Sequence, residues 1–156
     1  MNPKVKRLRQ QLQDLGLAVK EFERTTRTAA DAAAALNCKI EQIAKSIIFK
    51  DIVNELPVLA IMSGKNKVDL KKLEKLTGFP LEKADADFVL QSTGFSIGGV
   101  PPFGYEKDIK VFLDEELFNF PIVWAAAGTP NSVFAITPEE LLRWSKGKKA
   151  DLKIET

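Results

Sequence analysis

The lysine at position 45 is the side chain whose setting points most directly to chemistry. It stands in the stretch QIAKSIIF, where a predicted short helical turn runs into an apolar β-strand, so its stem cannot extend freely into water. A half-buried ammonium group must lose its charge or meet an anion, because burying an unpaired charge costs several kcal/mol. The pattern therefore suggests that Lys45 binds an anionic group. The alternative is a snorkelling side chain whose stem covers the sheet edge.

A second candidate is the loop GFSIGGVPPFGY at residues 94–105. Gly98 and Gly99 can adopt positive φ, and they let another molecule approach the main chain without meeting a β-carbon. Pro101 and the proline after it fix the chain in an extended form beyond Val100. Such a backbone presents N–H and C=O groups at set angles and can bind a carbonyl, an amino group or a nucleotide. The alternative is a strained structural turn that closes a barrel edge.

Two further sites are weaker candidates. In AAAGTPNS, Gly128 and the following Pro130 mark a tight turn, which favours a β-hairpin. The small residues before the turn, Ala127 among them, would equally suit a shallow pocket for a small side chain. Asp114, in FLDEE, is a polar candidate beside the pocket, although its place at the end of the strand IKVFLD favours a helix N-cap.

The absent residue types restrict the chemistry. The sequence has no histidine, which removes Ser-His and Cys-His catalysis and most catalytic zinc sites. Its single cysteine, Cys38, excludes an intrachain disulfide and argues against a thiolate metal cluster. Any reaction must use Lys, Asp, Glu, Ser, Thr, Tyr, backbone amides or groups of the substrate. No cofactor and no metal are predicted.

The bulk composition indicates an ordinary globular protein. The chain has 156 residues, of which 45% are hydrophobic and 28% charged, and we expect one domain over residues 1–156. A net charge of +2 does not by itself indicate nucleic-acid binding. The longest apolar runs fall far short of the roughly 20 residues that span a bilayer, and the N-terminus has no signal-peptide pattern. A cytoplasmic location without a membrane partner is expected.

The elements that must position these residues are mixed along the chain. Strands do not alternate one for one with helices, so an α+β fold with a mixed sheet is predicted rather than a doubly wound one. Helices are expected at 3–15, 29–37, 69–78, 85–94 and 138–144, with a short turn at 40–44, and strands at 46–53, 55–64, 109–114, 121–127 and 132–136, with weaker ones at 17–23 and 150–155.

Four segments in this order resemble a known family. They are RTAADAAAALNCKIEQIAKSIIF, GFSIGGVPPFG, VFLDEELF and VWAAAGTPNSVFAITPEELLRW. Together they are similar to the YbaK/EbsC family, which is related to the editing domain inserted in bacterial prolyl-tRNA synthetases. The resemblance runs from about Phe22 to Trp144. It implies a twisted, barrel-like mixed β-sheet surrounded by helices. It also implies a trans-acting deacylase that hydrolyses the ester between a wrong amino acid and tRNA, with aminoacyl-tRNA and possible synthetase partners such as prolyl-tRNA synthetase.

The resemblance also implies roles for particular residues. Lys45 corresponds to the family lysine thought to hold the terminal adenosine or its phosphate, and amides near Gly98 could steady the ester carbonyl. Because an aminoacyl ester is already activated, positioning and charge stabilisation should suffice, and a lysine with an ordinary pKa of about 10.4 serves as a cation, not a base. The implied substrate-binding residues are Ser46, Gly98, Gly99, Val100, Pro101, Asp114, Ala127 and Gly128.

One position departs from the family pattern. The last glycine of the loop is usually followed by histidine in the family, whereas Tyr105 follows it here. Tyrosine could replace a hydrogen bond of that histidine but not its titration near neutrality. The amino acid removed therefore stays open, as does a non-catalytic module that recognises aminoacyl-adenosine-like ligands or tRNA.

Overall fold

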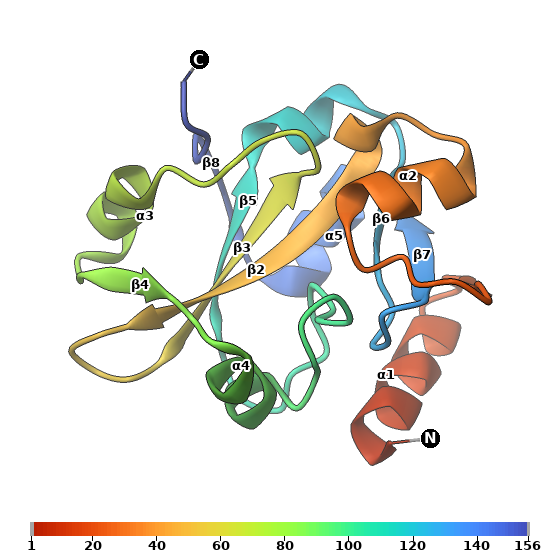
Figure 1. The fold of residues 1–156 in the computed structure, drawn as a ribbon, viewed down its shortest axis with the longest axis horizontal. Coiled ribbons are helices and arrows are strands. Elements are labelled where there is room, and N and C mark those ends of the chain that lie inside the picture. The colour runs from red at the N-terminus through yellow and green to blue at the C-terminus, as the bar shows by residue number, and fades with distance from the viewer. Residues whose placement is uncertain (1, 156) are drawn as a thin grey trace.

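A single mixed sheet forms the centre of the molecule. The computed structural model describes residues 2–155, and within that range the sheet has eight strands in the order β1-β7-β6-β2-β3-β5-β8, with β4 paired to β2 beside this path. The long β2–β3 pair twists across the middle of Figure 1. The strands are β1 (Val19–Glu21), β2 (Ile43–Asp51), β3 (Pro57–Ser63), β4 (Leu81–Lys83), β5 (Lys110–Asp114), β6 (Val123–Ala126), β7 (Ser132–Ile136) and β8 (Lys148–Ala150).

Helices surround this sheet. In Figure 1, α2 and α4 lie beside β2, and α5 lies behind the sheet. No helix within residues 2–155 is both long enough and apolar enough to cross a membrane. The helices are α1 (Pro3–Asp14), α2 (Ala29–Leu36), α3 (Leu70–Thr77), α4 (Ala86–Thr93) and α5 (Pro138–Ser145), with the 3-10 turns η1 (Ile40–Gln42) and η2 (Glu115–Asn119).

Neighbouring strands run in both directions. β2 is antiparallel to β3 and β4 but parallel to β6, and β5 is parallel to both β3 and β8. The hairpin β6–β7 is antiparallel, and β1 pairs with β7 at one end of the sheet. The predicted α+β class, with a mixed sheet flanked by helices, is confirmed.

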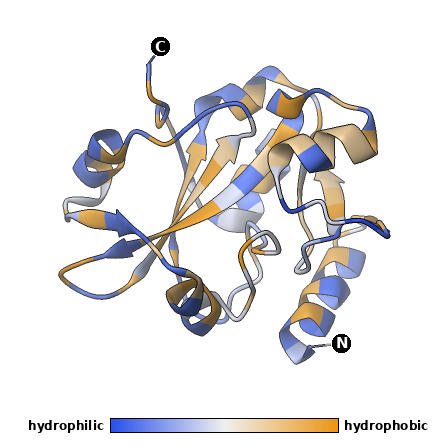
Figure 2. Cartoon of the chain, viewed as in Figure 1, coloured by the Kyte–Doolittle hydropathy of each residue, from blue (hydrophilic) through white to orange (hydrophobic). Residues whose placement is uncertain are grey.

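The sheet is covered on both faces, as the burial of β3 shows. Leu59 and Ile61 belong to one buried cluster, whereas Val58, Ala60 and Met62 belong to another. Because successive side chains of a strand point to opposite faces, the two clusters lie on opposite sides of the sheet. The first cluster also takes in buried residues of α1, α4 and α5, and the second those of α3. Apolar β2 and β3 contrast with the polar outer faces of the helices in Figure 2.

Capping residues begin and end the helices where the sequence predicts. The side chains of Thr28, Asp69 and Thr137 each accept a backbone N–H of the first turn that follows. Helices α3 and α4 stop at glycines with positive φ, Gly78 at 81° and Gly94 at 83°.

Two predicted elements differ near the candidate site. The turn expected at 40–44 is shorter, because Ile43 and Ala44 already pair with β6 and so belong to β2. Lys45 therefore lies inside the strand and not at a helix–strand junction. The short strand β4 has no counterpart among the predicted elements, since three residues with only Leu81 buried show no recognisable period.

The strand expected at 150–155 lies earlier in the chain. β8 ends at Ala150 and pairs with Phe112–Asp114 of β5. Gly147, just before β8, packs against β5, since a β-carbon there would lie 2.4 Å from Leu113 Cδ1. The residues after β8 continue without regular structure apart from one bridge between Lys153 and Val68.

Candidate active site

A cavity of about 440 Å³ opens beside the middle of β2. Its volume is in the range of small-molecule sites. Lys45 and Ser46 line it from β2, and Gly98 and Val100 line it from the Gly/Pro loop. The remaining walls come mainly from the segment before α2, from α2, from residues 124–126 of β6 and from the end of β4. The structure thus brings parts of all three predicted stretches together around one space, since Ala125 and Ala126 at the start of AAAGTPNS also line it.

The cavity exists because β2 changes partner along one edge. Strand β6 pairs with β2 only at Ile43 and Ala44. Strand β4 pairs with β2 from Phe49 onward, and Ala84 N just after β4 donates to Ile48 O at 3.1 Å. Between these points, within residues 2–155, no strand pairs with this edge. Lys45 stands at the start of that gap, so the strand positions its side chain directly at the opening.

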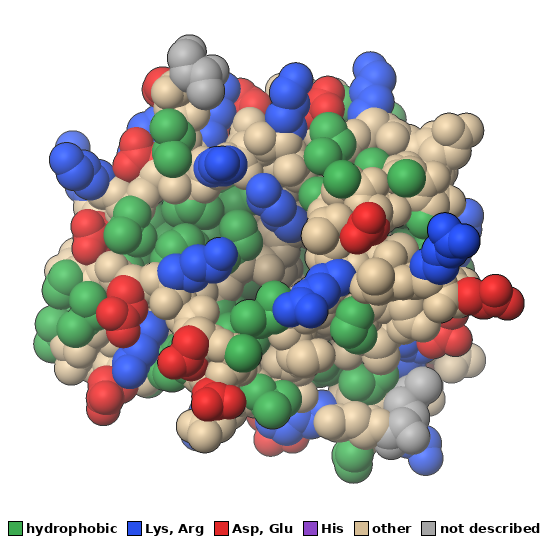
Figure 3. Space-filling view, in the orientation of Figure 1, with side chains coloured by type: hydrophobic (Ala, Val, Ile, Leu, Met, Phe, Trp, Pro, Cys, Tyr) green, Lys and Arg blue, Asp and Glu red, His purple; other side chains and the backbone are tan. Residues whose placement is uncertain are grey.

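The environment of Lys45 is cationic and only half open to water. Its Nζ donates to Gly64 O at 3.3 Å. Burial lowers the pKa of Lys45 below its usual value, the charges of Lys67 and Lys83 lower it further, and the charge of Asp114 raises it. Lys and Arg side chains gather near the middle of this face, whereas most acidic ones lie toward its rim (Figure 3). A positive field in a partly desolvated cavity favours an anionic ligand.

Ser46 brings an unused polar atom to the same cavity. Its Oγ is buried and has no hydrogen-bond partner among residues 2–155. Buried hydroxyl groups are normally hydrogen-bonded, so an orphan hydroxyl at a cavity is a natural contact for a ligand. The other cavity walls are mostly small and apolar, contributed by alanines of α2 and by Ala125 and Ala126 of β6.

The double glycine has two different functions. Gly98 has φ of 92° and is the third residue of a turn closed by Gly99 N donating to Ser96 O at 2.9 Å. Gly99 does not have positive φ, contrary to the expectation for both residues. It is glycine because a β-carbon there would lie 3.0 Å from the carbonyl oxygen of Gly128. Its N–H is used inside the turn, which leaves Gly98 and Val100 facing the cavity.

Several predicted site residues do not line this cavity. Pro101, Ala127, Gly128 and Asp114 are buried outside it, as is Gly99. Ala127 and Gly128 turn toward the N-terminal helix: Arg9 Nε donates to Ala127 O at 2.9 Å, and a β-carbon on Gly128 would lie 3.1 Å from Leu8 Cδ2. The hairpin interpretation of this turn is confirmed.

Asp114 is fully buried, and its carboxylate caps η2 by accepting Glu116 N at 3.0 Å. The N-cap interpretation is therefore confirmed. The residue does not line the cavity, but its charge acts on Lys45.

Tyr105 is also turned away from the cavity. Its Oη donates to Pro101 O at 2.5 Å, and its ring meets Phe95 edge to face at 6.1 Å. Burial raises the pKa of Tyr105, so the phenol stays a hydrogen-bond donor. The tyrosine at this position therefore bonds within the loop and does not line the cavity.

A second, larger cavity of about 690 Å³ lies behind the same loop, against Phe103 and Trp144. Neither of the two buried side-chain atoms without a partner in residues 2–155, Gln11 Oε1 and Ser46 Oγ, belongs to its lining. Size alone would favour this cavity, but the half-buried lysine and the orphan hydroxyl favour the first. Residues 2–155 contain no cluster of His, Cys, Asp and Glu suited to a metal ion.

Sequence reasoning missed several residues of the site. Arg27, Gly64, Lys83 and Trp124 all line the cavity. Lys83 is positioned by the unrecognised strand β4, and Arg27 lies in the irregular segment before α2. The pattern SG after the apolar run of β3 could have indicated Gly64 as a close backbone approach.

Comparison with known proteins identifies the family of the chain. The aminoacyl-tRNA editing domain family matches residues 23–144. "Putative Cys-tRNA(Pro)/Cys-tRNA(Cys) deacylase EbsC" of Enterococcus faecalis is 31% identical over 115 residues, which cover 70% of each chain. A proline–tRNA ligase of Brachyspira hyodysenteriae is 30% identical over 91 residues, which are 58% of this chain and 16% of that one. A crystal structure of "a putative trans-editing enzyme for prolyl tRNA synthetase" has a TM-score of 0.89 and 41% identity, covering 99% of both chains.

The fold is that of a small α+β domain with a mixed sheet, and its candidate site is a cavity beside β2 that Lys45 lines. The chain belongs to the aminoacyl-tRNA editing domain family. It is therefore an aminoacyl-tRNA deacylase, a hydrolase of ester bonds. The family resemblance stated from the sequence is confirmed.

Proposed function

We propose that this domain acts in trans and uses Lys45 to hold the esterified 3′ end of a mischarged tRNA while water cleaves the ester. The observation that carries the proposal is the convergence of Lys45, Ser46 and the Gly98–Val100 segment on one cavity. The ammonium group suits the terminal phosphate or adenosine, and the small apolar walls suit the base or a small amino-acid side chain.

The proposed reaction needs little from the protein beyond positioning. Water attacks the carbonyl carbon, the bond from that carbon to the ribose oxygen breaks, and a proton passes to the ribose oxygen. The products are the free amino acid and tRNA with its terminal hydroxyl restored. Main-chain amides of Gly98 and Val100 are the groups proposed to steady the charge on the carbonyl oxygen, since the Gly99 amide is engaged in its turn.

Water activation is assigned to a ribose hydroxyl of the substrate. The chain has no histidine, and within residues 2–155 no carboxylate lines the cavity. Lys45 is a poor base at neutral pH if it stays charged among anionic substrate groups. Its role is therefore electrostatic.

A deacylation panel tests the proposal. Purified protein is incubated with tRNAs carrying Ala, Ser, Thr or Cys, and loss of the ester is followed. tRNA(Pro) comes first, because EbsC and the structural relative are named for Cys-tRNA(Pro) and for prolyl-tRNA synthetase. We expect hydrolysis of at least one substrate and a drop in kcat/KM of about 100-fold for Lys45→Ala.

Lys50→Ala is the matched control. Lys50 lies on the same strand but does not line the cavity; it sits over the Phe88 ring, with Nζ 5.2 Å from its centroid. Its variant should retain kcat/KM within about threefold. If the parent protein turns over none of the four substrates on any tRNA tested, or if Lys50→Ala loses as much activity as Lys45→Ala, the proposed function fails.

A further inference from the structure

The turn after β3 controls where the Lys45 ammonium group lies. Gly64 O, the acceptor for Lys45 Nζ, belongs to this turn. The main chain at Gly64 has no room to move toward η1, because a β-carbon there would lie 2.3 Å from Ile40 O. Asn66 N donates to Ser63 O at 2.9 Å and closes the turn. Any shift of this turn therefore moves the group that holds Lys45.

Asp114 clamps both ends of that turn. Its Oδ2 accepts Ser63 N at 3.1 Å and Asn66 Nδ2 at 2.8 Å, while its Oδ1 accepts Glu116 N at 3.0 Å. All three contacts are made by a fully buried side chain. A carboxylate held by three N–H groups is a rigid anchor, because losing it would leave buried donors without a partner.

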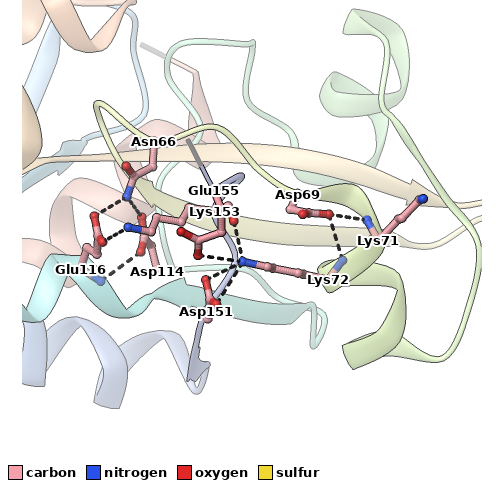
Figure 4. Close-up of polar contacts among 9 residues, drawn as sticks. All are labelled: Asn66, Asp69, Lys71, Lys72, Asp114, Glu116, Asp151, Lys153 and Glu155. Atoms are coloured by element: carbon pink, nitrogen blue, oxygen red, sulfur yellow. Dashed lines mark hydrogen bonds and ion pairs between the residues drawn. The ribbon is translucent and has the colours of Figure 1, made fainter.

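The C-terminal segment braces the same clamp from outside. Asn66 Nδ2 also donates to Glu116 Oε1 at 2.9 Å, and Lys153 Nζ is paired with the other oxygen of Glu116. Lys72 in turn donates to Lys153 O at 2.7 Å and pairs with Asp151 at 3.0 Å. Figure 4 shows these side chains converging from the turn, from η2, from α3 and from the C-terminal segment.

We infer that Asp114 is a positioning residue for Lys45, acting through Ser63 and Asn66 on the Gly64 carbonyl, and that it does not bind substrate itself. The inference rests on the proposed function for its kinetic consequence, but its structural part stands separately. The charge of Asp114 adds to the effect, because it counters the influence of Lys67 and Lys83 on Lys45. Arg27 is a further cation in the cavity wall.

The chain offers a matched pair of controls at the other end of β2. Asp51 is buried, and its carboxylate accepts Val53 N at 2.9 Å, Asn54 N at 3.0 Å and Asn54 Nδ2 at 2.9 Å. This Asp–Asn clamp resembles that of Asp114 and Asn66 but lies away from the cavity. Damage to it should affect stability alone.

The test compares Asp114→Asn and Asn66→Ala with Asp51→Asn and Asn54→Ala. Lys45 is observed by NMR of protein labelled with 13C-lysine, assigned with Lys45→Arg, and titrated from neutral to alkaline pH. We expect the Lys45 midpoint to fall by about half a pH unit or more in Asp114→Asn, and to stay in place in both variants of the Asp51 clamp. Thermal unfolding of all four variants measures the common loss of stability.

Kinetics then separate geometry from charge. Asn66→Ala keeps the Asp114 charge but removes one of its contacts to the turn. A rise in KM of about fivefold or more, with kcat changed less than about twofold, would show that Lys45 has moved. If the two clamps lose activity in proportion to stability, with the Lys45 midpoint unmoved, the inference is overturned. If the midpoint moves also in Asn66→Ala, which keeps the Asp114 charge, but the parent hydrolyses no aminoacyl-tRNA, the positioning role stands and the proposed function fails.

Discussion

The side chain of Arg27 fills the space that a β-carbon on Gly98 would occupy. Arg27 Cγ lies 2.4 Å from that position, and both residues line the cavity. Gly98 thus lets the segment before α2 close directly onto the loop, which forms part of the cavity wall. Two stretches distant in the sequence meet here without an intervening side chain.

Substitution of Gly98 should damage both the loop and this contact. Gly98→Ala introduces a side chain at φ of 92° and displaces Arg27, so we expect a loss of stability of about 1–2 kcal/mol and a fall in kcat/KM of about tenfold or more. Gly78→Ala is the control, because Gly78 also has positive φ but has nothing within 4 Å of the added carbon. Urea unfolding and deacylation of both variants check this. Equal losses of activity in the two would contradict it.

Removal of the Lys45 charge should not destabilise the free protein. Since burial and neighbouring lysines lower its pKa, the folded chain binds the proton less tightly than the unfolded chain. Between the lowered pKa and the ordinary value of 10.5, the folded chain has released the Lys45 proton while the unfolded chain still holds it, so stability rises with pH. Below that range both states are protonated, and the free-energy cost of burying the ammonium group is fully present.

Lys45→Met should therefore unfold at the same temperature as the parent or higher at pH 7, and this advantage should shrink as pH approaches 10.5. Circular dichroism melts across that range give the answer. A Lys45→Met protein clearly less stable at pH 7 would show that the ammonium group stabilises the fold.

The hydroxyl of Ser46 should matter to the ligand more than to the fold. Its Oγ is buried without a partner in residues 2–155, so Ser46→Ala should change stability by less than about 0.5 kcal/mol. The same variant should raise KM for the aminoacyl-tRNA that the parent hydrolyses. Ser63→Ala is the contrast, because Ser63 Oγ donates to Glu41 O at 2.7 Å and its loss should cost about 1 kcal/mol. Chemical denaturation ranks the two. An unchanged KM for Ser46→Ala would remove Ser46 from the binding site.

Tyr105 should act on stability and not on turnover. Tyr105→Phe deletes the hydrogen bond to Pro101 O and leaves a buried carbonyl unpaired, at a cost of about 1–2 kcal/mol. Because Tyr105 does not line the cavity, kcat/KM should stay within about threefold of the parent below the melting temperature. A selective loss of turnover, with stability retained, would mean that this position reaches the substrate.

The sequence predicted the helices and the long strands well, because their signals are local. Thr28, Asp69 and Gly78 mark helix ends by side-chain and backbone preferences that act within one turn. The apolar runs of β2 and β3 are long enough to show their burial. The strand β4 has only three residues, so no periodic signal distinguishes it from a loop.

The site was predictable only in part. Lys45, Ser46 and Gly98 were found from local pattern and family resemblance, and all three line the cavity. Pro101 and Gly128 stand in equally distinctive stretches but do not line the cavity. Pro101 O accepts the Tyr105 hydroxyl within the loop, and Gly128 packs against Leu8 of α1. Arg27 and Lys83 enter the cavity through long-range contacts that no local pattern encodes.

The short parallel pairing between β2 and β6 has a consequence for how the protein becomes active during synthesis. Lys45 leaves the ribosome well before Trp124, Ala125 and Ala126, which lie about 80 positions later and supply another wall of the cavity. A nascent chain that ends before β6 contains Lys45 but lacks the β6 wall of the cavity. Editing competence should therefore arrive only after β6 has left the ribosome and paired with β2.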